Sequence, residues 1–182
     1  WQIAVCYATG VGVQQNAVKA FEWYLKAAEQ DVVDAQYPLA LCYAEGKGTA
    51  QDDSEAARWY KKAAESGVAD AQYPLAMAYA YGIGISRNAS EAVKWFKKSA
   101  EQGVVEAQYE LAMCYMQGVG VSRNEAEAFR LFTIAAEKVS LLHNTSWLSV
   151  LKMEKAFHRT SIAHWLGTPK QRNKDTPMLK RL

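Results

Sequence analysis

A period of 36 residues organises most of this 182-residue chain. The tripeptide Ala-Gln-Tyr recurs at 35–37, 71–73 and 107–109, and single residues keep the same step, as in Tyr7, Tyr43, Tyr79 and Tyr115. A repeat of this length is one supersecondary unit, and its apolar side is buried only when neighbouring units stack. The sequence therefore predicts an array of stacked units over residues 1–138, after which the period is lost.

Within each unit the apolar residues follow a helical spacing. One stripe follows the pattern i, i+3, i+4, i+7, i+8, as in Ala56, Trp59, Tyr60, Ala63 and Ala64. A second stripe of the same kind precedes it in every unit, and nowhere does the alternation of a strand appear. We expect an all-α solenoid of antiparallel helix pairs over about 1–30, 34–66, 70–102 and 106–137.

Polar residues at fixed places predict where the helices begin and end. N-caps are expected at Asn16, Asp52, Asn88 and Asn124, with a capping box completed by Glu55, Glu91 and Glu127. Left-handed turns are expected at Gly67 and Gly103, where the first copy has Asp31 instead. Prolines near the first turn of two helices, Pro38 and Pro74, should cost little because an N–H is unpaired there anyway.

These motifs together resemble a known family. Gly-x-Gly, the Asn/Asp cap, Glu-Ala, Trp-Tyr/Phe, Lys-Ala-Ala-Glu-x-Gly and Ala-Gln-x-x-Leu-Ala are similar to the Sel-1-like repeat, a relative of the tetratricopeptide repeat. The resemblance covers residues 1 to about 138, with Ala in place of the usual Gly at 40, 76 and 112. It implies a right-handed superhelix and a non-enzymatic scaffold or adaptor that holds a protein or peptide partner.

Charge and hydropathy narrow the class of protein further. No apolar run approaches the roughly 20 residues needed to span a bilayer, so we expect a soluble protein, cytoplasmic or periplasmic. Residues 1–138 hold 13 Lys/Arg against 17 Asp/Glu, a mildly acidic balance that gives no reason to expect nucleic acid. The chain starts inside a first helix and lacks an initiator Met, which suggests a fragment whose true N-terminus is missing.

Residues 139–182 differ sharply from the array. They carry 8 Lys/Arg against 2 Asp/Glu and hold all three histidines. A one-base slip would explain this, because the codons of Met153 and Glu154 then give glycine, in the slot 36 residues after Gly118. In that frame the repeat motifs return in register. We therefore interpret 139–182 as a frameshifted fifth repeat, a hypothesis that the nucleotide sequence decides.

No residue pattern in the chain indicates catalysis, a cofactor, a metal or a small-molecule substrate. Cys6, Cys42 and Cys114 occupy one slot of the repeat, too far apart for disulfides, and are expected as small buried hydrophobes. Cysteine-rich relatives of this repeat have been linked to β-lactam binding or hydrolysis, which makes a β-lactamase-like enzyme the alternative class. Those relatives pair cysteines within each unit, and this chain does not. A chromogenic β-lactam would discriminate the two classes.

A candidate partner-binding strip lies on the first helix of each unit, on the concave face that the solenoid would form. Positions spaced i, i+4, i+8 turn away from the core stripe. The strip comprises Tyr37, Leu41, Glu45, Tyr73, Met77, Tyr81, Tyr109, Met113, Met116 and Gln117. Its aromatic and Met content suits a peptide or helix partner. The alternative for its three Ala-Gln-Tyr tyrosines is that they pack between adjacent units.

Overall fold

The computed structural model describes residues 1–142, with side-chain surroundings as far as Lys138. Within this part of the chain all regular structure is helical. The helices are α1 (Gln2–Thr9), α2 (Ala17–Glu29), α3 (Val33–Glu45), α4 (Asp53–Glu65), α5 (Gln72–Tyr81), α6 (Ala89–Glu101), α7 (Val105–Gln117) and α8 (Glu125–Leu142), with a 3₁₀ turn η1 (Ala69–Ala71) before α5. The predicted all-α fold of helix pairs is confirmed.

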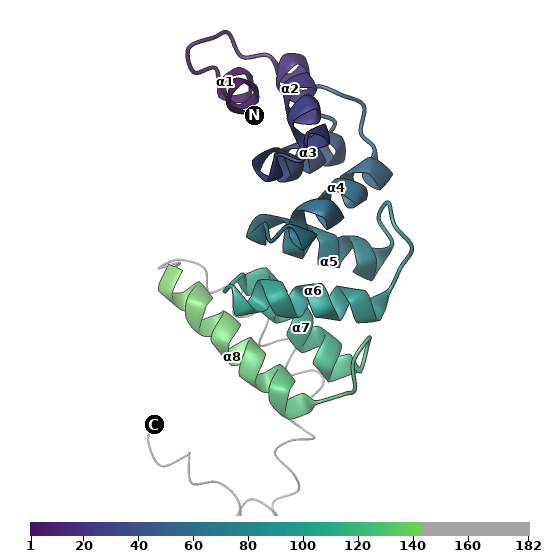
Figure 1. Ribbon diagram of the computed structural model, residues 1–182. Helices are drawn as coiled ribbons and strands as arrows, with labels where there is room; N and C mark the ends of the chain where they lie inside the picture. Colours follow the sequence, from purple (N-terminus) through teal and green to yellow (C-terminus); the bar gives the residue numbers. More distant parts are fainter. Residues whose placement is uncertain (143–182) are drawn as a thin grey trace, which may run out of the picture. The chain divides into compact units, whose positions relative to one another are not determined.

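The chain divides into two compact units, Trp1–Leu131 and Phe132–Leu182, with the boundary inside α8. In the first unit consecutive helices from α1 to α7 pack against one another (Figure 1). We call α1, α3, α5 and α7 the first helices of their repeats, and α2, α4 and α6 the second helices. Such stacking buries an apolar face that no single pair could bury.

The core of the first unit combines small residues with the aromatic rings of the second helices. Trp59 and Trp95 are almost fully buried, and so are alanines at matching places in successive repeats, including Ala28, Ala40, Ala64, Ala76 and Ala112. Alanine lets helix backbones approach closely, and the rings fill the remaining space. In the last copy of the Ala-Gln-Tyr motif, the buried Gln108 adds a hydrogen bond between helices. Its Nε2 on α7 donates to the Ala100 carbonyl on α6 at 3.1 Å.

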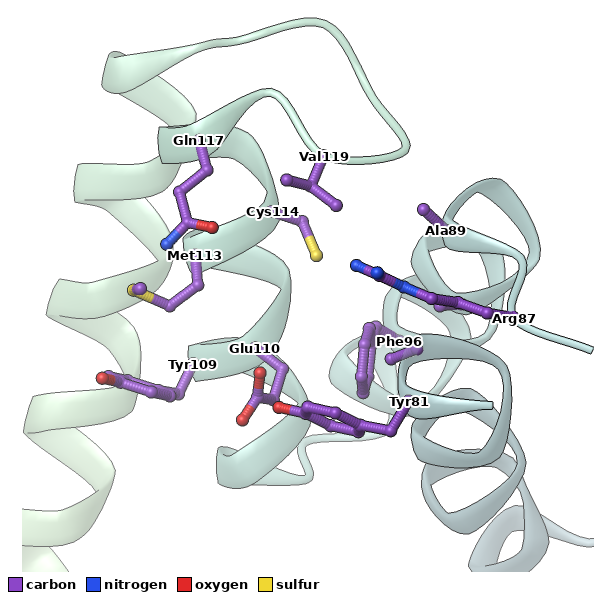
Figure 2. Close-up of a pocket in the computed structure, with 12 residues that line it drawn as sticks. Tyr81, Arg87, Ala89, Phe96, Tyr109, Glu110, Met113, Cys114, Gln117 and Val119 are labelled. Carbon is purple, nitrogen blue, oxygen red and sulfur yellow. The ribbon is translucent and has the colours of Figure 1, made fainter. Parts of the chain in front are cut away.

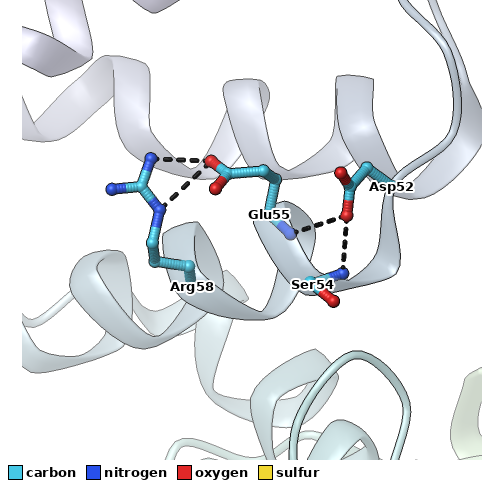
Figure 3. Close-up of polar contacts among 4 residues, drawn as sticks. All are labelled: Asp52, Ser54, Glu55 and Arg58. Carbon is cyan, nitrogen blue, oxygen red and sulfur yellow. Dashed lines mark hydrogen bonds and ion pairs between the residues drawn. The ribbon is translucent and has the colours of Figure 1, made fainter.

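The helix starts confirm the four N-caps but correct the capping box. Asp52 Oδ1 accepts from the backbone N–H groups of Ser54 and Glu55, at 2.9 and 3.0 Å (Figure 3). The N–H of Asp52 itself donates to the Tyr43 carbonyl at 3.0 Å, so it is not available to the Glu55 side chain. Glu55 binds Arg58 instead, and Glu91 and Glu127 likewise pair with the basic residue three positions on. The expected reciprocal bond was therefore wrong.

The same backbone bond joins the cap to a tyrosine in every repeat. The N–H groups of Asn16, Asn88 and Asn124 donate to the carbonyls of Tyr7, Tyr79 and Tyr115 at 2.8–2.9 Å. This bond closes the loop between the first and second helix of each repeat. The side chain of the cap residue thus caps the second helix of the repeat, and its backbone N–H donates a hydrogen bond to the first helix.

Two turn predictions have different outcomes. Gly67 and Gly103 adopt left-handed backbone with φ of 91° and 92°, as expected, and Asp31 does the same with φ of 61°. Pro74 is the third residue of α5, in its first turn, also as expected. Pro38, however, is the sixth residue of α3, because that helix begins at Val33, so it lies just beyond the turn in which a missing N–H costs little.

The hypothesis of a frameshifted fifth repeat falls mainly on residues 143–182, which lie outside the described residues. The boundary at residue 138 likewise stays a prediction. Helix α8 itself continues without a break from Glu125 to Leu142.

Candidate partner-binding site

The predicted strip lies on α3, α5 and α7, and its members differ in exposure. Tyr81 is the most prominent, with 60% of its surface exposed at the end of α5. Glu45 and Gln117 are exposed at the ends of α3 and α7, and Glu45 forms an ion pair with Lys47. The remaining members are half-buried, namely Tyr37, Leu41, Tyr73, Met77, Tyr109, Met113 and Met116.

Two of the strip tyrosines contact a ring of their own repeat. The Tyr37 ring lies 6.0 Å from that of Tyr60 on α4, and the Tyr73 ring lies 6.0 Å from that of Phe96 on α6, both centroid to centroid. These contacts join the first and second helix of one repeat, and packing of the tyrosines between adjacent repeats stays a prediction. Each ring therefore contributes to packing while keeping an accessible edge.

A pocket of about 340 Å³ brings four members of the strip together (Figure 2). Tyr81 comes from α5, and Tyr109, Met113 and Gln117 come from α7. The base includes Phe96 of α6, which is fully buried. The other members of the strip, Tyr37, Leu41, Glu45, Tyr73, Met77 and Met116, do not line it. We call this site the α5/α7 pocket.

The residues of the α5/α7 pocket that were not predicted as site residues include three with a polar or reactive group, Arg87, Glu110 and Cys114. Figure 2 shows the Glu110 carboxylate beside the Tyr81 hydroxyl, and the Arg87 guanidinium pointing towards Cys114. One signal was available in the sequence. Glu110 occupies the slot in which the two preceding repeats carry Pro38 and Pro74.

Burial raises the pKa of the Glu110 carboxyl above its ordinary value. The Glu110 carboxylate in turn raises the pKa of the Tyr81 hydroxyl, with burial as the second cause. Burial, followed by the Glu110 charge, raises the pKa of the Cys114 thiol to about 11. A thiol with so high a pKa is uncharged and a poor nucleophile at neutral pH. Cys114 therefore contributes a polarisable, largely apolar surface to the lining of the pocket.

The cysteines lie close to expectation. All three are free, Cys42 is buried, and Cys6 and Cys114 are half-buried. Within the described residues, no three or more His, Cys, Asp or Glu side chains are grouped so as to hold a metal ion. The same part of the chain contains no helix both long enough and apolar enough to cross a membrane.

Comparison with protein families agrees with this architecture. The family model described as Sel1 repeat matches four consecutive segments, residues 1–32, 33–68, 69–104 and 105–140. No curated protein matches the chain. The four segments correspond to the successive helix pairs of the structure, and each begins at or close to the start of a first helix.

Solved structures show the same similarity. A Sel1 repeat protein from Oxalobacter formigenes is 39% identical, with a TM-score of 0.70, and the alignment covers 75% of this chain and 56% of that protein. Protein c5321, a protective antigen of uropathogenic Escherichia coli with an SLR fold, is 36% identical with a TM-score of 0.69, over 75% of this chain and 29% of that one. The chain thus spans about half of the first relative and under a third of the second.

A third structure shares the fold alone. Helicobacter pylori cysteine rich protein B is 21% identical, with a TM-score of 0.50, over 68% of this chain and 88% of that protein.

Sel1 repeat proteins are generally protein-interaction scaffolds, typically without catalytic activity. Since the family model matches residues 1–140 in four consecutive repeats, this chain belongs to the Sel1 repeat family.

Proposed function

We propose that this protein is a non-enzymatic scaffold that binds a peptide or protein segment across the first helices α3, α5 and α7. The observation that carries the proposal is the α5/α7 pocket. It combines the exposed ring of Tyr81 with Met113 in a hollow of about 340 Å³. Aromatic and methionine side chains at a concave site provide large, adaptable contact area for a partner.

The arrangement of the strip supports a partner longer than one side chain. Leu41, Met77 and Met113 hold the same slot in three successive repeats and are all half-buried. A partner segment crossing this row would meet one such side chain per repeat, with the α5/α7 pocket as its deepest anchor. Anchors of this kind usually supply most of the binding energy of an interface.

The test uses peptides selected from a random display library against the full chain. The double variant Met77→Ala, Tyr81→Ala should bind the selected peptides at least about tenfold more weakly by calorimetry. Helicity and thermal unfolding should stay close to those of the unmodified protein, because neither side chain is fully buried.

The matched control is Lys61→Ala with Lys97→Ala, two exposed positions on the second helices α4 and α6. This variant should bind the same peptides with unchanged affinity. Peptides that ignore the Met77/Tyr81 variant but respond to the lysine variant would place the binding surface on the second helices. A large loss of stability in the Met77/Tyr81 variant would assign those side chains to the core.

A further inference from the structure

We infer that the α5/α7 pocket takes a basic side chain of the partner, arginine in preference to lysine, which pairs with the Glu110 carboxylate beside the Tyr81 ring. This inference rests on the proposed function and specifies the chemistry of the partner.

Glu110 is a half-buried carboxylate that no cation neutralises among residues 1–138. The glutamates in the first turns of α4, α6 and α8, by contrast, each have a cation three residues on. Glu55 pairs with Arg58 at 2.6 Å, Glu91 with Lys94 at 3.3 Å, and Glu127 with Arg130. Removing a carboxylate from water without a partner costs free energy, so an incoming cation at this point would be favoured.

The first helices reinforce that preference, because every charged residue on them is acidic. Helices α3, α5 and α7 carry Asp34, Glu45, Glu106 and Glu110 and no Lys or Arg. The second helices α4 and α6 carry both signs in nearly equal number, six Lys or Arg against five Asp or Glu. A basic segment is therefore attracted more strongly to the row of first helices than to the row of second helices.

The Tyr81 ring distinguishes arginine from lysine. A planar guanidinium can stack on an aromatic face and form two parallel hydrogen bonds to a carboxylate, whereas an ammonium is a strongly hydrated point charge. The chain already uses such packing elsewhere, since the Arg58 guanidinium lies 4.8 Å from the centre of the Trp59 ring. Tyr81 is 60% exposed, which leaves room for an equivalent contact.

Arg87 lines the same pocket and opposes a bound cation. Its side chain is exposed, so water screens its charge, and Figure 2 shows it directed towards Cys114, away from the Glu110 carboxylate. The preceding repeat has Gln51 in this slot. Removing the Arg87 charge should therefore strengthen binding of a cationic side chain and weaken binding of an anionic one.

The experiment measures binding of the full chain to four immobilised pools of short synthetic peptides. The pools share a random neutral background and carry Arg, Lys, Leu or Glu at the central position. The Arg pool should bind about tenfold more tightly than the Leu pool, with the Lys pool between them. Glu110→Gln should abolish the difference in affinity between the Arg pool and the Leu pool.

Two variants act as controls. Glu106→Gln removes an exposed acidic residue from the same helix outside the pocket, and the preference for arginine should persist. Arg87→Gln should increase binding of the Arg pool, because it removes the opposing charge. Thermal unfolding of each variant shows that the fold is retained.

The outcomes separate this inference from the proposed function. Equal binding of the Arg and Leu pools, both weakened by Met77→Ala, Tyr81→Ala, would overturn the preference for a basic side chain and leave the scaffold function standing. Tightest binding of the Glu pool would overturn the inference and make Arg87 the recognising group. Failure of all four pools to bind would count against both proposals.

Discussion

Gly84 meets the backbone of Asp53 so closely that a Cβ atom on the glycine would overlap the Asp53 carbonyl oxygen. Asp53 is the first residue of α4, in the repeat before that of Gly84. Gly48 has the same relation to Ala17, and Gly120 to Ala89. In these three repeats the second glycine of the Gly-x-Gly pair therefore marks the place where the loop of one repeat touches the second helix of the repeat before it.

Replacing Gly84 by alanine should be far more damaging than replacing Gly82 in the same loop. Both glycines have positive φ, 66° and 74°, so both variants carry backbone strain of about 1 kcal/mol. Only at Gly84 does the new methyl group collide with backbone, since a Cβ on Gly82 meets its nearest neighbour, Arg87 Cβ, at 3.5 Å. Urea unfolding followed by circular dichroism should show Gly84→Ala losing about 3 kcal/mol or more.

Gly12 provides a second control for that prediction. It holds the equivalent slot in the first repeat with φ of 74°, and a Cβ there would meet nothing within 4 Å. Gly12→Ala should thus resemble Gly82→Ala. Equal losses at Gly12 and Gly84 would mean that backbone strain alone, and not contact between repeats, selects glycine in this slot.

Asp52→Ala should lower the free energy of unfolding by about 1 kcal/mol, because two N–H groups of the first turn of α4 lose their acceptor. Asp52→Asn is the matched control. Asparagine caps the second helices at Asn16, Asn88 and Asn124, so this variant should stay close to the unmodified protein. A loss of equal size for both variants would assign the effect to the carboxylate charge at the helix terminus.

Asp31→Gly should raise stability by about 0.5 kcal/mol. Asp31 has φ of 61°, a conformation that glycine adopts without steric cost, and glycine already fills this slot at Gly67 and Gly103. The variant also loses the ion pair of Asp31 with Lys62 at 2.7 Å, but exposed pairs contribute little. Differential scanning calorimetry measures the change in Tm. The control is Asp31→Ala, which keeps the strained positive φ and loses the ion pair with Lys62. This control should not be more stable than the unmodified protein.

Glu110→Gln should raise the free energy of unfolding at neutral pH by less than about 1 kcal/mol, with a slight rise in Tm. The effect is small because solvent screens the half-exposed carboxylate. Burial raises the pKa of Glu110 in the folded chain. The stability that Glu110 contributes is therefore fully present below its unfolded pKa and is lost as pH rises through the folded pKa. The advantage of Gln should shrink as pH falls through that window, and a difference in Tm that grows towards acid pH would contradict this reading.

The helix pairs were determined by the sequence itself. Their signals lie within a few residues of one another, as in the cap of Asp52 and the stripe from Ala56 to Ala64, and the 36-residue period repeats them until chance is excluded. Local hydrogen bonds and helical periodicity need no knowledge of distant residues. For this reason the helices, their caps and the family are all predictable from the sequence.

Tertiary structure decided what happens between helices. The N–H of Asp52 has the Tyr43 carbonyl as its partner because the loop folds back on α3, and this excludes the capping box. Likewise, Tyr81 and Glu110 are 29 positions apart and line one pocket only because α5 and α7 belong to stacked repeats. Sequence periodicity places a residue on a helix face, but the distance between two faces depends on the packing of all the side chains between them.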